Sequence, residues 1–177
     1  SDVRLALRAV NASIVPGTDT QLSFNGQTEL QLAPGLEAIS DPVAFSFAAG
    51  QDIAISFYIS GETGPLTWHS VSFDTQYVTP QNAGNTTEDI IGASFSEVTV
   101  GWFFVSGIDV QKQDHLGAIV TLGDSITDGA FQTPGTNTRW PDLLAQRLQA
   151  AGIPMGVLNE GINSNQVTKS SQNGGEA

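Results

Sequence analysis

The sequence contains no cysteine and only two lysines, and it has no long apolar run. Without cysteine there is neither a disulfide framework nor a thiolate metal site. The apolar stretches fall well short of the ~18 residues that a membrane-spanning helix needs. The two histidines, His69 and His115, stand far apart without paired acids at ligand spacing, and no Gly-rich phosphate loop with its lysine is present. We therefore expect no metal and no cofactor.

Basic residues are also scarce, and the net charge is −12. Residues 1–115 hold 13 acidic against 3 basic side chains, and residues 116–177 hold 5 against 3. A negative field repels phosphate backbones and anionic lipid headgroups, so neither a nucleic acid nor a membrane surface is an expected partner. Charged residues make up only 14% of the chain, against roughly 25% in an average soluble domain. The excess of small polar residues is typical of a secreted or periplasmic protein.

Residues 1–115 carry the pattern of an all-β domain. Short runs of β-branched and aromatic residues alternate with Gly-, Pro- and Asn-containing turn signals. The candidate strands are VRLAL, TQLSF, TELQL, VAFSF, DIAISFYI, LTWHSVSF and SEVTVGWFFVSGIDV. Residues 44–60 alternate on both sides of a Gly-containing loop, which predicts a hairpin. The spacing of these strands predicts a β-sandwich, of jelly-roll type.

The pattern changes near residue 116. Residues 116–122 form a continuous apolar run, as expected of a strand buried on both faces. Residues 138–152 have helical periodicity, with Pro141 in the first turn and a glycine at the end. Residues 155–161 predict a second strand, so residues 116–177 read as the first part of a parallel α/β sheet. Because two strands and one helix are too few for a stable domain, we expect the sheet to continue in a segment outside this chain.

The stretch GDSITDG, residues 123–129, has two readings that can coexist. Ser125 can cap a helix, with Asp128 three residues later completing a capping box. It can also be a nucleophile, because a serine at the carboxyl end of a strand lies where open α/β sheets bind ligands. Asp124 is then a turn residue whose hydrogen bonds hold the loop, rather than a proton carrier.

Several motifs together resemble the SGNH, or GDSL, hydrolase family. GDSITDG resembles its first block, and NEGINSNQ, residues 159–166, resembles its second block. NTRWPDLLAQRL resembles the sequence that separates these blocks in one branch of the family. FNGQTELQLAPGLEAISDP and GPLTWHSVSF resemble the β-rich half of that branch. The resemblance implies a flavodoxin-like α/β fold after residue 115.

The resemblance also implies roles for individual residues. Ser125 matches the nucleophile, and its backbone N–H would be one oxyanion donor. Ser164 stands where the family has a glycine whose N–H is a second donor, and that donor survives only if the local backbone suits a residue with a Cβ. Asn165 matches an asparagine with a supporting role. The third-block asparagine and the Asp-x-x-His that supplies the base are expected beyond Ala177, on a C-terminal fragment of the same polypeptide.

The expected function is therefore a serine ester hydrolase acting on short acyl esters, with acetyl groups on carbohydrate as one substrate. The alternative is a carbohydrate-binding module with an inactive hydrolase remnant, or a purely structural domain. Some side chains have both packing and functional interpretations. The pattern around His69 indicates a histidine packed in a strand. Arg139 and Trp140 could line a substrate cleft, and Trp140 also fits the buried face of the helix. Four strand aromatics fit either core packing or sugar stacking: Trp68, Trp102, Phe103 and Phe104.

Overall fold

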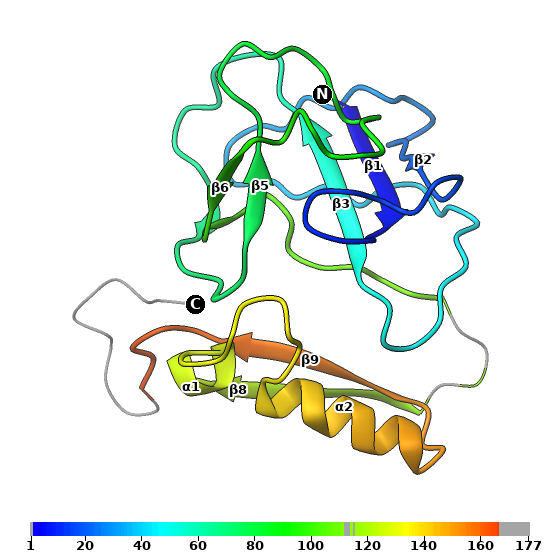
Figure 1. Ribbon diagram of the computed structural model, residues 1–177, viewed down its shortest axis with the longest axis vertical. Coiled ribbons are helices and arrows are strands. Elements are labelled where there is room, and N and C mark those ends of the chain that lie inside the picture. Colours follow the sequence, from blue (N-terminus) through cyan, green and yellow to red (C-terminus); the bar gives the residue numbers. More distant parts are fainter. Residues whose placement is uncertain (1, 112–113, 115, 167–177) are drawn as a thin grey trace. The chain divides into compact units, whose positions relative to one another are not determined.

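The computed structural model describes residues 2–111, 114 and 116–166, and it divides the chain into two compact units. Unit 1 comprises Ser1–Leu66 and Tyr77–Thr99, and unit 2 comprises Thr67–Gln76 and Val100–Ala177. Figure 1 shows both units with most of their elements labelled. The expected domain boundary at residue 115 stays a prediction, because compactness alone does not define a part that folds independently.

Unit 1 is built around a small antiparallel sheet in the order β2-β1-β3. Its strands are β1 (Asp2–Leu7), β2 (Thr20–Gln21) and β3 (Ile53–Tyr58). Leu5 and Ala6 of β1, with Ile14, form its buried apolar core. A second, two-stranded sheet joins β5 (Gln76–Val78) to β6 (Glu97–Thr99). These are the small antiparallel sheets expected of a β-rich half, and the jelly roll stays a prediction.

The strand pairing in unit 1 differs from the expected hairpin at residues 44–60. Residues 43–47 form no strand, and β3 pairs instead with β1, in a register that sets Arg4 opposite Ser56. The run TELQL, residues 28–32, is likewise irregular, whereas β5 arises from a segment without a strong strand pattern. The apolar alternation identified β3 correctly, but its partner was decided by contacts distant in sequence.

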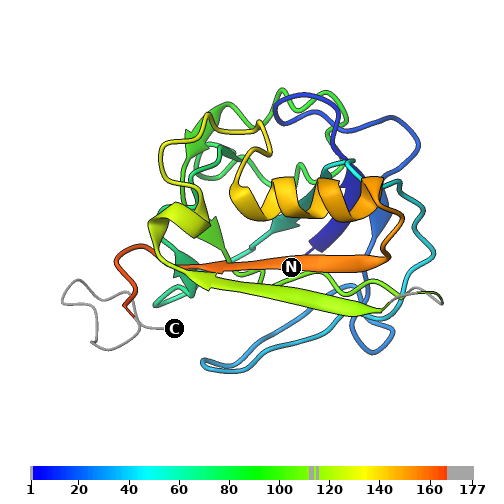
Figure 2. The ribbon, with the colours of Figure 1, turned by 90° about the horizontal axis from the view of Figure 1, so that it is seen from below.

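Unit 2 contains the predicted α/β segment. The strands β8 (Gly117–Gly123) and β9 (Met155–Gly161) pair in parallel along their full length. Between them lie α1 (Ser125–Asp128) and α2 (Trp140–Ala150), and α2 runs alongside the strand pair (Figure 2). A short antiparallel pair, β4 (Trp68–His69) and β7 (Trp102–Phe103), belongs to the same unit. The parallel pair fits the start of an α/β fold.

The predicted helix is confirmed together with its boundary signals. Pro141 occupies the first turn and is fully buried, and the Asp142 carboxylate accepts a hydrogen bond from the Arg139 N–H at 2.9 Å. Gly152 follows the helix with φ +68°, a conformation that glycine adopts without a steric penalty. Trp140, expected in the buried stripe, is nevertheless 46% exposed.

Within the described residues, β8 is not buried on both faces. Exposure alternates along the strand, and the outward side chains of Val120 and Leu122 are 53% and 78% exposed. Leu158, paired with Val120 on β9, is 48% exposed. The opposite face holds Thr121, which is buried. The described residues of unit 2 therefore leave a row of apolar side chains on this sheet in contact with solvent.

Candidate active site

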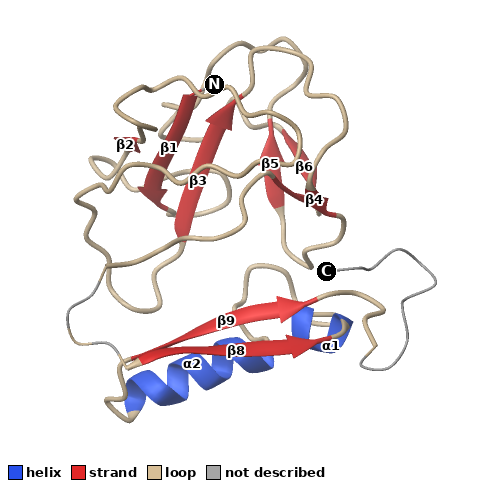
Figure 3. Cartoon of the chain, turned by 180° about the vertical axis from the view of Figure 1, so that it is seen from behind, coloured by secondary structure: helices blue, strands red, loops and turns tan. Residues whose placement is uncertain are grey.

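Ser125 lies directly after the carboxyl end of β8, where α1 begins. Figure 3 shows β8 and β9 pointing toward the same edge, with α1 at the end of β8. Glycine at position 123 allows this turn, because a Cβ there would collide with the Thr127 side chain. The parallel strand, the sharp turn and the short helix thus position Ser125 at the edge of the sheet where α/β proteins bind ligands.

The helix cap at this turn is Asp124 and not Ser125. The Asp124 Oδ1 accepts a hydrogen bond from the Ile126 N–H at 3.0 Å, and the Asp124 backbone is extended. Aspartate is among the preferred N-cap residues. The N-cap therefore lies one residue earlier than the capping box of Ser125 and Asp128 predicts. Asp124 holds the loop through hydrogen bonds, as its interpretation as a turn residue predicts.

Because Asp124 caps the helix, the Ser125 side chain is not needed as the N-cap. Within the described residues, neither the hydroxyl nor the backbone N–H of Ser125 makes a hydrogen bond. The residue is half-buried, so its hydroxyl is accessible without being fully solvated. A hydroxyl and an N–H that are both available on one residue are what a nucleophile and its own oxyanion donor require.

The end of β9 is joined closely to α1. The Asn159 side-chain amide donates to the Thr127 carbonyl at 2.9 Å and its oxygen accepts from the Gly161 N–H at 3.0 Å. At Gly161 a Cβ would collide with the Asp128 backbone. Ile162 continues this connection, because its N–H donates to the Gly123 carbonyl at 3.0 Å. Asn159 was not singled out from the sequence, although it opens the second block.

The structure brings the second block to the same edge as Ser125, since the block begins in the last residues of β9 and continues beyond the strand. Ser164 has φ +65°, the left-handed conformation that favours glycine. The Asn165 N–H donates to the Ile162 carbonyl at 3.0 Å, and its side-chain oxygen accepts from the Gln166 N–H at 3.1 Å. Asn165 therefore stabilises the local turn, and the roles of Ser164 and Asn165 in catalysis stay predictions.

His69 and Asp128 form a side-chain pair that the sequence did not reveal. The His69 Nε2 donates to the Asp128 Oδ2 at 2.8 Å, and the Asp128 side chain is only 10% exposed. Burial raises the pKa of the Asp128 carboxyl above its ordinary value, and interactions with His69 and Arg139 oppose this rise. The two residues are 59 positions apart, so no local pattern could indicate the pair.

Arg139 and Trp140 also contact the Ser125 helix. The Arg139 Nε donates to the Asp128 carbonyl at 2.6 Å, and a terminal guanidinium nitrogen donates to the Ser72 carbonyl at 2.9 Å. The Trp140 indole N–H donates to the Thr127 hydroxyl at 3.1 Å. Both side chains thus support α1 by hydrogen bonds, and the half-exposed Trp140 ring is only partly core.

The aromatic candidates of unit 2 are partly exposed. Trp68 and Phe103 stack at a centroid distance of 5.7 Å with an interplanar angle of 13°. Trp68 is 55% and Trp102 41% exposed, so both side chains are partly accessible to solvent. His115, the second histidine of the chain, lies outside the described residues.

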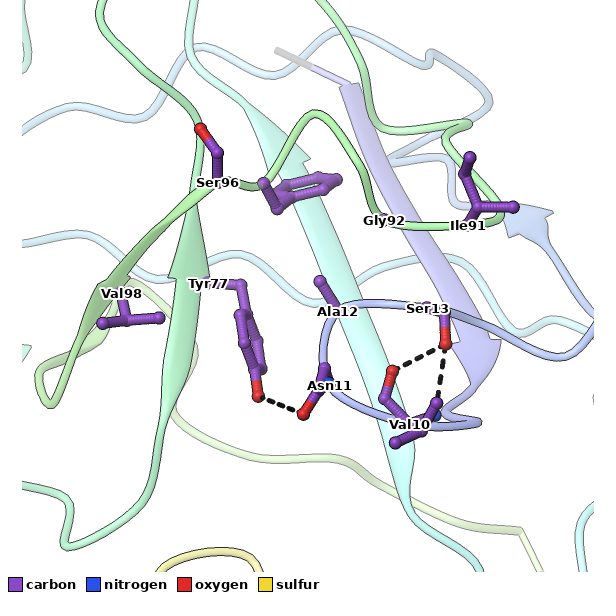
Figure 4. Close-up of a pocket in the computed structure, with 10 residues that line it drawn as sticks. Val10, Asn11, Ala12, Ser13, Tyr77, Ile91, Gly92, Ser96 and Val98 are labelled. Atoms are coloured by element: carbon purple, nitrogen blue, oxygen red, sulfur yellow. Dashed lines mark hydrogen bonds between the residues drawn. The ribbon is translucent and has the colours of Figure 1, made fainter.

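An open pocket of about 390 Å³ is found in unit 1 (Figure 4). Tyr77 and Phe95 contribute rings to its lining, and the Tyr77 hydroxyl donates to the Asn11 side-chain oxygen at 3.3 Å. Aromatic rings beside amide and hydroxyl groups are compatible with a small polar ligand.

Among residues 2–111, 114 and 116–166, no group of three His, Asp or Glu side chains could hold a metal ion. In the same described part, no helix combines the length and apolarity needed to cross a membrane.

A comparison with protein families finds a match for this region. Residues 119–175, from β8 through the second block, match the family model of the GDSL-like Lipase/Acylhydrolase. No curated protein matches the chain. The family match includes Ser125 and Ser164 and supports the resemblance to SGNH hydrolases. For the matched segment it supports an ester hydrolase in general.

Proposed function

We propose that this chain carries the nucleophile of a serine ester hydrolase of the SGNH type, and that Ser125 is that nucleophile. The observation that carries the proposal is the position of Ser125. It follows a parallel strand, lies at the carboxyl edge and has a hydroxyl and an N–H without partners among the described residues. The match of residues 119–175 to an acylhydrolase family supports the same chemistry.

In the proposed reaction the Ser125 hydroxyl oxygen attacks the ester carbonyl while a histidine takes its proton. The C–O bond to the alcohol then breaks, the histidine returns the proton to the departing alkoxide, and water releases the acyl group in the reverse sequence. The backbone N–H groups of Ser125 and Ser164 stabilise the oxyanion, together with an asparagine from outside the chain. Asp124 and Asn165 support the two loops.

The histidine base and its aspartate come from a C-terminal segment of the same polypeptide, outside residues 1–177. His69 is not the base in this proposal, because the resemblance locates the base in an Asp-x-x-His segment outside residues 1–177. The exposed apolar row of the β8–β9 sheet supports a further segment, since Val120, Leu122 and Leu158 would be covered by continuation of the α/β fold.

The substrates are short acyl esters, with acetyl groups on carbohydrate as the favoured class, and the protein acts in a secreted or periplasmic setting. Exposed rings at Trp68 and Trp102 support a carbohydrate alcohol portion, because sugar C–H faces stack on aromatic side chains. The acidic charge of −12 supports a neutral substrate rather than a polyanion.

The test is the Ser125→Ala variant, assayed with p-nitrophenyl acetate on the natively purified protein. We expect turnover to fall by on the order of 10³-fold or more, because the attacking oxygen is lost. Circular dichroism and the urea midpoint should be unchanged, since the hydroxyl has no partner within the described residues. Ser106→Ala, an exposed serine of unit 2, is the matched control and should keep full turnover. Turnover retained in Ser125→Ala would refute the assignment.

The alternative is a carbohydrate-binding module with an inactive hydrolase remnant. The exposed Trp68–Phe103 stack and the unit 1 pocket favour it. In that case neutral glycans would bind without Ser125-dependent turnover, and Trp68→Ala or Tyr77→Ala would lower the affinity. Affinity electrophoresis in neutral polysaccharide gels, run beside the esterase assay, distinguishes the two, because the binding module is retarded by glycan without Ser125-dependent turnover, whereas the hydrolase shows that turnover.

A further inference from the structure

The contact between His69 and Asp128 joins two parts of unit 2 that are distant in sequence. The His69 imidazole, on β4, is 31% exposed, and its Nε2 lies 2.8 Å from the nearly buried Asp128 carboxylate. A buried carboxylate is costly unless it is paired and hydrogen-bonded. Because Asp124 already caps α1, the Asp128 side chain is not required for capping. Its burial beside a histidine therefore needs another explanation.

Asp128 is mechanically coupled to Ser125 because the two residues begin and end the same helical turn. The N–H groups of Gly129 and Ala130 donate to the Ser125 carbonyl at 3.0 and 2.7 Å, and the Asp128 N–H donates to the Asp124 carbonyl at 3.0 Å. Residues three apart on a helix also lie on adjacent parts of its surface. A displacement of Asp128 would consequently move Ser125.

Two side chains secure this turn, and they act on different atoms of Asp128. Arg139 binds the backbone carbonyl, whereas His69 binds the side-chain carboxylate. Arg139 also binds the Ser72 carbonyl, three residues beyond His69. The guanidinium adds a favourable charge near the carboxylate, and burial opposes ionisation by raising the pKa of Asp128. His69 is thus the residue whose hydrogen bond compensates the buried charge.

We propose that His69 is a positioning residue for the nucleophile: its imidazole holds the Asp128 carboxylate and thereby fixes the helical turn that begins at Ser125. The inference rests on the proposed function, because it assigns His69 a task in presenting the Ser125 hydroxyl. It extends that function by giving the β4 strand of unit 2 a role in the active site. His69 does not move a proton to or from the substrate in this assignment.

The experiment compares His69→Ala with His69→Gln in the intact protein by hydrogen exchange and steady-state kinetics. Glutamine keeps an N–H donor on a side chain of suitable length, whereas alanine leaves the buried carboxylate without it. In His69→Ala we expect amide exchange in residues 125–130 to accelerate about tenfold, because a hydrogen bond to a charged group is lost. We also expect kcat to fall about tenfold with little change in KM. His69→Gln should recover most of both losses.

A double-mutant cycle with Asp128→Asn tests whether His69 acts through Asp128. Asparagine removes the buried charge but retains an oxygen acceptor. The effect of His69→Ala on exchange should therefore be several-fold smaller in the Asp128→Asn background. Equal effects in both backgrounds would overturn the proposal, as would unchanged exchange in His69→Ala. Equal loss of kcat in the alanine and glutamine variants, with normal exchange, would instead make His69 an acid–base group and also overturn it.

The Ser125→Ala variant separates failure of this inference from failure of the proposed function. If wild-type turnover does not depend on Ser125, the proposed function fails, and the exchange measurements still decide whether His69 fixes the turn. If turnover depends on Ser125 but exchange and kcat do not respond to His69→Ala, the function stands and the positioning role is excluded.

Discussion

At the scale of single residues, Ser164 combines a side chain with a backbone conformation suited to glycine. Its φ of +65° lies in the left-handed region, where a Cβ crowds the following carbonyl oxygen. The proposed oxyanion donor therefore occupies a strained position. Strain of this kind is frequently found at functional sites, where the surrounding structure maintains it. The hydrogen bond from the Asn165 N–H to the Ile162 carbonyl is part of that support.

The variant Ser164→Gly should raise the free energy of unfolding by about 0.5–1 kcal/mol, because relief of the left-handed strain exceeds the extra backbone entropy of glycine. Esterase turnover should be kept or increased, since the backbone N–H is unchanged. Urea unfolding and p-nitrophenyl acetate hydrolysis measure the two effects. Ser106→Gly, at a position without positive φ, is the control and should not gain stability. A loss of stability in Ser164→Gly would show that the serine side chain itself is required.

At the scale of elements, the packing of α1 on the end of β9 determines where Ser125 lies. The two elements approach so closely at Gly161 that a Cβ would overlap the Asp128 backbone. Asn159 closes the same junction through its two side-chain hydrogen bonds. Gly161, at the end of β9, thus sets how closely α1, which follows β8, can approach.

The variant Gly161→Ala should lower the free energy of unfolding by about 1–3 kcal/mol, as overpacking does in a close-packed region. It should also reduce turnover, because α1 must move away from β9 and carry Ser125 with it. Gly107→Ala is the matched control in unit 2, where a Cβ meets no atom within 4 Å and the φ is not positive. Its free energy of unfolding, measured by urea denaturation, should change by no more than about 0.5 kcal/mol. Equal stability of both variants would contradict the close approach.

At the scale of the whole molecule, the β8–β9 sheet with its uncovered row of apolar side chains supports a longer α/β fold. Val120, Leu122 and Leu158 would each gain from burial against a further layer. The proposed base and its aspartate would arrive with that layer. Completion of the sheet and completion of the active site are therefore one hypothesis, and a single measurement tests both.

Denaturing intact-mass spectrometry of the natively purified protein should reveal mass beyond the 18.6 kDa of residues 1–177, as a longer chain or as a second polypeptide in equal amount. The additional segment should contain an Asp-x-x-His sequence, since this is where the resemblance locates the base. High-salt washing should not remove a second polypeptide, because the contact surface on this chain is apolar. A single species of 18.6 kDa would leave Ser125 without the proposed base and would favour the binding module.

Much of the α/β segment could be predicted because its signals are local. The apolar run before Gly123, the proline in the first helical turn and Gly152 at the helix end each act on their own neighbourhood. The position of Ser125 after β8 followed from the same reasoning. Residues 44–60 failed as a hairpin because alternation identifies a strand but not its partner, and β3 pairs with the distant β1.

The sequence by itself determined that Ser125 follows a strand and opens a helix, that β8 and β9 run in the same direction, and that the molecule carries a strong negative charge. Only the tertiary structure decided that Asp124 is the cap, that His69 holds the Asp128 carboxylate, and that Gly161 sets the approach of α1. The physical reason is the sequence separation between the residues that interact. Helix and strand periodicity depends on neighbours within a few residues, whereas the His69–Asp128 contact spans 59 positions and exists only when the chain is folded.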